Sequence, residues 1–300
     1  MKTLLTGKNG QLGWELQRAL PPLGALHAFD SSGLDLRDLP RLREVVRDLK
    51  PSVIVNAAAY TAVDLAESDI ETAQTVNGAA PGVLAEEAAR LGAALVHFST
   101  DYVFDGLKGS PYTETDSANP LGAYGESKLA GEHAIQEAGG SYWIFRTSWV
   151  YSLRRDSLVT KPSFVTKVLE WAREHETLRV VADQTAGPTW CRTLAEVVAR
   201  LLREAGEDPS TWIGERGGLY HLAAGGYASR YEWAKAILKY DPRPEEQVVR
   251  QVLPAASSEF PTPAQRPAFS ALDCGLFDST FGIPRPGWEE SLRSALGGIW

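Results

Sequence analysis

The stretch AYGESKLAGE places Tyr124 four residues before Lys128. A phenol can protonate a carbonyl oxygen that accepts hydride, and a nearby ammonium favours the phenolate that remains. The sequence contains 10 tyrosines in 300 residues, so this spacing arises by chance often enough to carry little weight alone. Residues four apart on a helix also pair for plain packing. The interpretation therefore depends on the residues around the pair.

Two hydroxyl groups and a carboxyl group stand where they could meet this pair. HFSTDYVFDG follows an apolar run, so Ser99, Thr100 and Asp101 are expected at the carboxyl end of a strand. Tyr124 begins the next predicted helix at the same edge, where ligands bind in open α/β sheets. Thr100 could hydrogen-bond a substrate oxygen that Tyr124 protonates. We expect Lys128 to hold a ribose hydroxyl and to lower the pKa of Tyr124. The set Tyr124, Lys128 and Thr100 therefore predicts reduction of a ketone.

A glycine-rich turn provides a place for the hydride donor. Gly7, Gly10 and Gly13 lie between the first predicted strand and the first predicted helix. Glycines there let the backbone approach a pyrophosphate at a helix N-terminus. Asp30 ends the second strand, where an acid can accept hydrogen bonds from the adenosine ribose and favours NAD. The two serines that follow it could bind the 2′-phosphate of NADP, so the choice between NADH and NADPH stays open.

Short apolar runs alternate with helical periodicity through the first half of the chain. The predicted strands are 3–5, 26–29, 53–55, 94–98 and 142–145, and the predicted helices are 11–20, 39–49, 71–91 and 124–138. Strands that are apolar throughout and separated by helices predict a parallel sheet covered on both faces. We therefore predict an α/β fold with a Rossmann-type doubly wound parallel sheet.

The second half is less regular and predicts a small C-terminal α/β substrate lobe. The expected elements are helices at 164–175, 193–205 and 229–240 and strands at 178–181 and 219–222. The polar stretch 152–163 and the Pro-, Ser- and Ala-rich stretch 254–270 are predicted to be irregular loops. We expect residues 1–150 to form the NAD(P)-binding Rossmann domain. Residues 151–300 would be mainly the substrate-binding lobe, with some segments returning to the Rossmann core.

Composition excludes several classes of protein. The net charge of −8 argues against a general nucleic-acid binder. No apolar run approaches the roughly 18 residues of a membrane span, and the N-terminus does not resemble a signal peptide. Cys191 and Cys274 lack metal-binding or redox spacing and are expected to be reduced, packed thiols. We expect a cytoplasmic protein with neither a nucleic-acid nor a membrane partner.

Taken together, the motifs resemble a known family. The glycine-rich loop, NAAAYTAVDLAE, STDYVFDG, YGESKLAGE and RTSWVY are similar to those of extended short-chain dehydrogenases/reductases, and most closely to the dTDP-4-dehydrorhamnose reductases. The similarity continues through DQTAGPT, GLYHLAAGG and PTPAQRPAFSALD, so it covers nearly the whole chain. The resemblance implies that NADPH or NADH reduces the C4 ketone of dTDP-4-dehydro-L-rhamnose to give dTDP-L-rhamnose.

The resemblance also implies roles for individual residues. Tyr124 would be the proton donor, and Lys128 would support it and contact the nicotinamide ribose. The dTDP-sugar would contact Thr100, Asp101, Tyr124, Trp149 and Arg266. A guanidinium such as that of Arg266 matches the oxygens of the sugar diphosphate. The residues expected to line the cofactor are Gly7, Gly10, Gln11, Leu12, Gly13, Asp30, Asp35, Leu36, Ala59, Tyr60, Thr61 and Lys128.

The chain departs from the family pattern in two places. After WVY the family often has a short glycine- and asparagine-bearing turn, whereas SLRRDSLVTKPSF is longer and charged. Some members are magnesium-linked dimers that use glutamates. Glu15 and Glu289 match in position, but Arg192 stands where a further acid would be expected. We therefore predict no metal and leave a homodimer open.

Two other functions are compatible with the same fold. One is another nucleotide-sugar enzyme, a dehydratase, epimerase or different reductase. Dehydratases of this group place a glutamate directly after the Thr-Asp pair, where this chain has Tyr102. The other is a non-catalytic dinucleotide-binding regulatory subunit resembling that of methionine adenosyltransferase. The intact set of Thr100, Tyr124 and Lys128 favours turnover, and substrate-dependent NAD(P)H oxidation would separate these functions.

Overall fold

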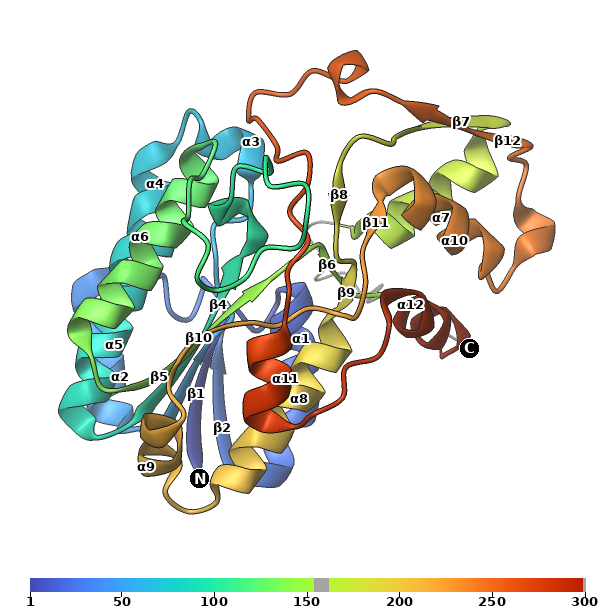
Figure 1. The fold of residues 1–300 in the computed structure, drawn as a ribbon. Helices are drawn as coiled ribbons and strands as arrows, with labels where there is room; N and C mark the ends of the chain where they lie inside the picture. Colours follow the sequence, from blue (N-terminus) through green and yellow to red (C-terminus); the bar gives the residue numbers. More distant parts are fainter. Residues whose placement is uncertain (154–161, 299–300) are drawn as a thin grey trace.

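A computed structural model describes residues 1–153 and 162–298, which form a large parallel sheet beside a smaller α/β lobe (Figure 1). The sheet has six strands in the order β10-β5-β4-β3-β1-β2, and every neighbouring pair is parallel. The strand order reverses direction between β1 and β3, which opens a crevice at the carboxyl edge. The strands are β1 (Lys2–Thr6), β2 (Ala25–Phe29), β3 (Val53–Asn56), β4 (Ala94–Thr100), β5 (Ser141–Thr147) and β10 (Gly218–His221).

Helices cover both faces of this sheet, which confirms the predicted fold class. Every residue of β3 and β4 is buried, as expected for strands enclosed on both sides. One face packs against α1 (Gln11–Ala19), α8 (Cys191–Ala205) and α11 (Gly275–Phe281). The other packs against α2 (Leu39–Leu49), α5 (Ala80–Leu91) and α6 (Ala123–Ala138), and the two layers are visible on either side of the strands in Figure 1.

The predicted strands and helices of the first half are confirmed to within a few residues, except that the helix predicted at 71–91 is interrupted. It consists of α4 (Ile70–Gln74), a π-helical turn at Thr75–Ala79, and α5. Within that turn Asn77 accepts from the Tyr60 backbone N–H at 2.8 Å and donates to its carbonyl at 3.1 Å. The preceding segment contains the short helix α3 (Val63–Ala66). The interruption therefore ties the helix to the loop that follows β3.

The second half divides its elements between the lobe and the sheet. The lobe contains α7 (Phe164–Glu174), β7 (Thr177–Val181), α10 (Arg230–Lys239), β12 (Gln251–Ala255) and α12 (Trp288–Gly297) around a core that includes Trp233. The chain returns to the sheet through α8, α9 (Pro209–Glu215), β10 and α11. Two short pairings complete this half, β6 (Val150–Tyr151) with β9 (Thr189–Trp190), and β8 (Thr185–Ala186) with β11 (Ala228–Ser229).

Some predictions for the second half need correction. The stretch 254–270 is not irregular from its start, because Pro254 and Ala255 belong to β12, which pairs in parallel with β7. The sequence reading also missed α9, α11 and α12. The predicted loop at 152–163 lies mostly outside the described residues.

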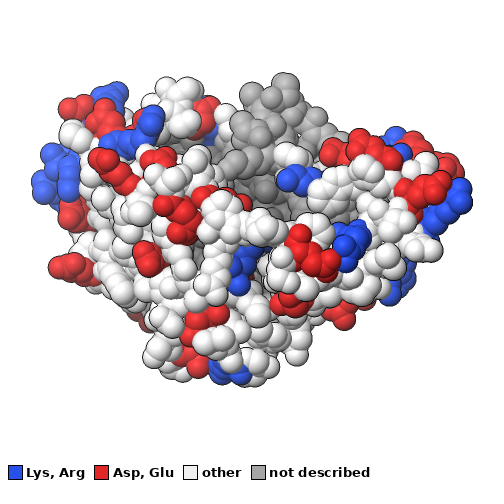
Figure 2. Space-filling view, turned by 90° about the horizontal axis from the view of Figure 1, so that it is seen from above, with Lys and Arg blue, Asp and Glu red and all other residues white. Residues whose placement is uncertain are grey.

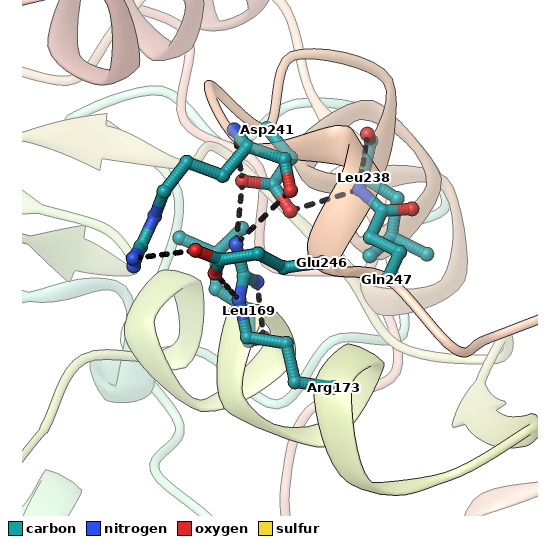
Figure 3. Close-up of polar contacts among 7 residues, drawn as sticks. Leu169, Arg173, Leu238, Asp241, Glu246 and Gln247 are labelled. Carbon is teal, nitrogen blue, oxygen red and sulfur yellow. Dashed lines mark hydrogen bonds and ion pairs between the residues drawn. The ribbon is translucent and has the colours of Figure 1, made fainter.

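A cluster of ion pairs and hydrogen bonds in the lobe joins α7 to the end of α10 (Figure 3). Arg173 of α7 donates to Asp241 at 3.0 Å and to Glu246 at 2.7 Å. Gln247 donates to Asp241 at 2.8 Å and to the Leu238 carbonyl at 3.1 Å. Asp241 is buried, and its several donors hold its pKa below the usual range although burial opposes them. These contacts bind the end of α10 to α7.

Candidate active site

Tyr124 stands at the carboxyl edge of the sheet because the start of α6 is held in place from two sides. Glu67 accepts from the Ala123 backbone N–H at 3.0 Å. Gly125 lies so close to the 3-10 turn after β4 that an added Cβ would be 2.2 Å from the Tyr102 carbonyl oxygen. The Tyr102 and Tyr124 rings meet edge to face with centroids 5.8 Å apart. The Thr100 side chain lies close enough to the phenol of Tyr124 to act on its pKa.

The pKa of Tyr124 corrects one expectation. Burial raises this pKa well above its ordinary value, and the charge of Asp101 adds to the rise. The Thr100 side chain acts in the opposite direction and favours the phenolate. Lys128 was expected to lower the pKa of Tyr124, but the net shift is upward because burial outweighs the groups that favour the phenolate. Tyr124 is therefore firmly protonated in this structure, as a proton donor must be.

Lys128 is buried and its ammonium position faces the interior of the sheet. Its Nζ donates to the Phe98 carbonyl at 2.7 Å and lies 3.1 Å from His97 Nε2. Burial lowers the pKa of Lys128 to about 8, while Glu132 opposes this shift. Within residues 1–153 and 162–298 the polar contacts of this side chain are with β4, not with the Tyr124 hydroxyl.

Asp101 is a buried carboxyl group surrounded by hydroxyl donors. Ser270 donates to it at 2.5 Å, Ser148 at 3.0 Å and Thr100 at 3.3 Å. Burial nevertheless raises the pKa of Asp101 to about 6, because three hydroxyl groups compensate only part of the lost hydration. Ser148 and Ser270 were not singled out in the sequence. They come from distant segments, and only the tertiary fold brings them to Asp101.

Two arginines lie near Tyr102, and only one of them, Arg266, was predicted from the sequence. Arg266 donates to Asp64 at 2.8 Å, and both Arg266 and Arg230 act electrostatically on the Tyr102 side chain. Arg230 Cζ lies 3.6 Å from the ring centroid of Trp149. Arg230 was missed because a single arginine at a helix start carries no local signal. Arg230 thus links the two predicted substrate contacts, because it packs on Trp149 and, like Arg266, acts on Tyr102.

The predicted phosphate loop has the geometry of an anion site. Gly7 has a φ of +76°, and an added Cβ would lie 2.7 Å from the Ala58 nitrogen. The Gly10 nitrogen donates to the Gly7 carbonyl at 3.0 Å and closes the turn. Among the residues that the structure describes, no side chain caps the start of α1, which leaves its first N–H groups available to an anion. An added Cβ on Gly13 would come within 2.0 Å of the Gly7 carbonyl, so α1 packs closely on the turn. These features fit a dinucleotide pyrophosphate.

Asp30 and Asp35, the two acids that follow β2, each lie beside a cationic side chain. Asp30 accepts from Ser32 and Gly33, and its pKa is lowered to about 2, first by the Ser32 hydroxyl. Lys8 Nζ lies 3.4 Å from Asp30 Oδ2. Asp35 likewise pairs with Arg37 at 2.6 Å, and this pairing lowers its pKa. The edge predicted to hold the adenosine ribose therefore has both hydrogen-bond acceptors and two cations.

The remaining predicted cofactor residues lie on α1 and on the loops that follow β2 and β3. Gln11 accepts from the Ser152 backbone N–H at 2.7 Å, which joins α1 to the segment after β6. Tyr60 donates to Asp69 at 3.0 Å. Leu12 and Leu36 are buried, Ala59 is half-buried and Thr61 is exposed.

A small cleft opens between α6 and the loop at 264–267. It is lined by Val63, Glu67, Tyr102, Leu121, Gly122, Tyr124, Gly125, Ala264, Gln265 and Pro267. Figure 2, which looks down on the carboxyl edge of the sheet, shows acidic and basic side chains mixed over this face. Tyr124 therefore borders this cleft, together with Tyr102 and the start of α6.

The described residues contain no group of three or more His, Cys, Asp or Glu side chains that could hold a metal. Glu15 is buried and pairs with Arg192 at 3.4 Å. Burial raises the pKa of Glu15, and Arg192 opposes that rise. Glu289 accepts from Tyr240 at 2.7 Å and from Lys239 at 3.1 Å. Both glutamates therefore take part in contacts with cations or hydroxyl groups of the same chain.

Cys191 and Cys274 are buried and free. Among the helices that the structure describes, none is long and apolar enough to cross a membrane.

Three features together define the class of this protein: the six-stranded parallel sheet, the glycine turn at its switch point, and the Tyr-x-x-x-Lys helix at its carboxyl edge. They are the features of a Rossmann-type enzyme of the extended short-chain dehydrogenase/reductase class.

Comparison with known proteins narrows this class to a family. The family model described as RmlD substrate binding domain matches residues 1–299. The dTDP-4-dehydrorhamnose reductase of Burkholderia thailandensis is 44% identical over 295 residues, which are 97% of each chain. A crystal structure of such a reductase from Clostridium acetobutylicum superposes with a TM-score of 0.88 at 34% identity and covers 99% of both chains. The Bacillus anthracis reductase, solved in complex with NADP, gives a TM-score of 0.86 at 33% identity over 98% of both chains. The chain belongs to the RmlD family, to which the resemblance in its motifs also pointed.

Proposed function

We propose that this chain reduces the C4 ketone of dTDP-4-dehydro-L-rhamnose to dTDP-L-rhamnose with NADPH or NADH. The single observation that supports this most is the meeting of Tyr124 and Thr100 at the carboxyl edge, beside an uncapped glycine turn. Family membership supports the choice of sugar, because the matched relatives carry the name of that reductase. When bound, the nicotinamide supplies the hydride.

Side chains of the protein donate the proton and stabilise the phenolate that its transfer leaves. Tyr124 gives its proton to the C4 oxygen as negative charge develops there, since its raised pKa keeps it protonated beforehand. Thr100 acts on the Tyr124 phenol in the direction that favours the phenolate that forms. Lys128 is one helical turn further along α6, where an ammonium would favour the same phenolate and could hold a ribose hydroxyl.

The nucleotide sugar is assigned to the side of the sheet that faces the lobe. Arg266 and Arg230 present two guanidinium groups around Tyr102, and such groups match diphosphate oxygens in a bidentate way. Trp149 gives the sugar an aromatic wall, and Asp101 can accept from a sugar hydroxyl. We assign dinucleotide binding to residues 1–150 and sugar binding mainly to the elements of 151–300 that form the lobe.

The cofactor is assigned to the crevice between β1 and β3. Gly7, Gly10, Gln11, Leu12 and Gly13 would lie along the pyrophosphate. Asp30, Asp35 and Leu36 would face the adenosine ribose, and Ala59, Tyr60 and Thr61 would border the nicotinamide half together with Lys128. Lys8 and Arg37 add cations beside Asp30 and Asp35, which supports use of the 2′-phosphorylated cofactor as well as NADH.

Other properties stay predictions. A homodimer remains open, and we expect neither nucleic acid nor membrane as a partner. Two free, buried thiols are what a reducing compartment such as the cytoplasm favours.

The deciding experiment measures oxidation of NADPH and NADH with and without dTDP-4-dehydro-L-rhamnose. We expect oxidation that depends on the sugar and yields dTDP-L-rhamnose. Cofactor binding without sugar-dependent oxidation would support a regulatory binding protein instead. Conversion of the sugar without net consumption of NAD(P)H would support an epimerase or dehydratase.

A further inference from the structure

Three polar side chains form a row across the sheet within an otherwise apolar layer. Thr6 of β1 and Asn56 of β3 are register partners, and Asn56 in turn pairs with His97 of β4. We call these three residues the polar row. All of them are buried, and the row ends at Lys128, where His97 Nε2 lies 3.1 Å from Nζ. Since buried polar groups are costly, such a row needs a reason.

The backbone fixes the direction of the hydrogen bonds along the row. The Ala58 N–H can only donate, and it donates to Asn56 Oδ1 at 3.3 Å. The Thr6 hydroxyl donates to the same oxygen at 2.6 Å. The amide nitrogen of Asn56 therefore faces His97 Nδ1 at 3.0 Å, and this ring nitrogen must accept. A neutral imidazole carries one proton, so the proton lies on Nε2 and points at Lys128.

The Nε2–H of His97, which points at Lys128, favours one of the two protonation states of Lys128. An ammonium offers donors only, so it cannot accept from His97 Nε2, whereas an unprotonated amine can. The Phe98 carbonyl accepts from Nζ at 2.7 Å and is satisfied by either form. Burial acts in the same direction, because it lowers the pKa of Lys128 to about 8 and holds that of His97 well below its ordinary value. Glu132 opposes, but its carboxylate is already paired with Arg146 at 2.6 Å.

We propose that His97 is a positioning residue for the reductase: its Nε2–H favours the unprotonated amine of Lys128, and the polar row sets the pH at which Lys128 becomes an ammonium one helical turn from Tyr124. The tautomer and the titration are properties of the chain itself. Only the consequence for turnover rests on the proposed function.

That consequence has a definite sign. An ammonium at Lys128 favours the phenolate and so helps Tyr124 to release its proton to the sugar. Lys128 loses its charge as pH rises through about 8. We therefore expect kcat/KM to fall as pH rises through the same range.

The first test needs no variant. Nitrogen-15 NMR of histidine-labelled wild-type protein distinguishes the two neutral tautomers and the imidazolium. We expect His97 to be neutral at pH 7 with its proton on Nε2. A proton on Nδ1, or an imidazolium, would overturn the proposal, and this result stands even if every variant of His97 fails to fold.

The second test changes the partner of Lys128. In His97→Gln the amide oxygen can accept from an ammonium, so the Lys128 titration should move upward by roughly one pH unit. Carbon-13 NMR of labelled lysines follows this titration, with Lys128→Arg for assignment. The alkaline limb of kcat/KM should move with it. His221→Gln is the matched control, since His221 is equally buried but hydrogen-bonds the Tyr112 and Asp273 carbonyls. The His221→Gln variant should leave both the Lys128 titration and the alkaline limb of kcat/KM unchanged.

The outcomes separate the two proposals. A folded His97→Gln protein with an unmoved Lys128 titration refutes the role of His97, whether or not the wild type reduces the sugar. A moved titration in a protein that shows no sugar-dependent oxidation refutes the proposed function and leaves the coupling of His97 to Lys128 intact.

Discussion

The guanidinium of Arg230 packs against the Trp149 indole, with Cζ 3.6 Å from the ring centroid. Arg230 opens α10 in the lobe, whereas Trp149 follows β5 of the sheet, so the contact joins the two parts near Tyr102. Trp149 has a φ of +38°, which is an unfavourable backbone conformation for a large side chain. Strain of this kind is kept where surrounding contacts over-determine it, and such positions cluster at ligand sites.

Replacing Arg230 should weaken sugar binding. Arg230→Met keeps much of the apolar packing but removes the charge, so we expect KM for the dTDP-sugar to rise about tenfold, with a smaller change in kcat. Steady-state kinetics at saturating NADPH measures this. Arg200→Met, on the exposed face of α8, is the control and should leave KM unchanged. An unaltered KM in Arg230→Met would exclude this residue from the diphosphate site.

Removing the phenol of Tyr124 should stop proton transfer while leaving the site in place. In Tyr124→Phe we expect kcat to fall by roughly 10² or more, because the positioned acid is lost. NADPH binding, followed by fluorescence, should stay close to that of the wild type. Tyr240→Phe removes a surface hydroxyl that donates to Glu289 and should retain full activity. Wild-type kcat in Tyr124→Phe would show that another group donates the proton.

Lys8 should distinguish the two cofactors. Its ammonium lies 3.4 Å from Asp30, where the 2′-phosphate of NADPH would meet the protein. In Lys8→Ala we expect the Kd for NADPH to rise about tenfold relative to that for NADH, since a charge-assisted hydrogen bond to phosphate is lost. Isothermal titration with each cofactor tests this, with the exposed Lys167→Ala as control. Equal changes for both cofactors would place the 2′-phosphate elsewhere.

Asp101 should make stability fall as pH rises between about 4 and 6. Its pKa is raised from 3.8 to about 6 in the folded protein, so the unfolded chain loses this proton first. The stabilising contribution is full below the unfolded value and is lost as pH rises through the folded one. Urea unfolding of wild type and Asp101→Asn should therefore diverge across this range by on the order of 2 kcal/mol.

A second aspartate provides the opposite sign as a control. Asp208 caps α9, and the Thr211 hydroxyl and N–H hold its pKa below the usual range. Its contribution is present above the unfolded pKa and is lost as pH falls. If Asp101→Asn and the wild type keep a constant difference in unfolding free energy from pH 4 to 6, Asp101 is not buried as a shared hydroxyl acceptor.

Local sequence was sufficient wherever the structure depends on nearest neighbours. The central strands were predictable because all positions of β3 and β4 are buried, so both consist mainly of apolar residues, with His97 the one polar residue inside the predicted run of β4. Tyr124 and Thr100 were predictable because each sits in a short motif at the end of an element. The fold class follows from these features together.

Other features depend on contacts between distant segments, which local patterns do not show. The π-helical turn forms around Asn77, whose partner Tyr60 lies on another loop. β12 escaped notice because Pro254 argues against a strand, although a proline is tolerated at the edge of a two-stranded sheet. The direction of the Lys128 side chain depends on the register that places His97 beside Asn56. No spacing along the chain encodes that register.

The path of the chain has a consequence for how the molecule can be made and cut. β10, the last strand of the sheet, comes after β9 and before β11, so sheet and lobe are interleaved along the polypeptide (Figure 1). Truncation after residue 150 would remove an edge strand together with α8 and α11, exposing one face of the sheet. Neither part can be released as one continuous fragment. During synthesis the sheet must also wait for half of the lobe to emerge before its own edge is complete.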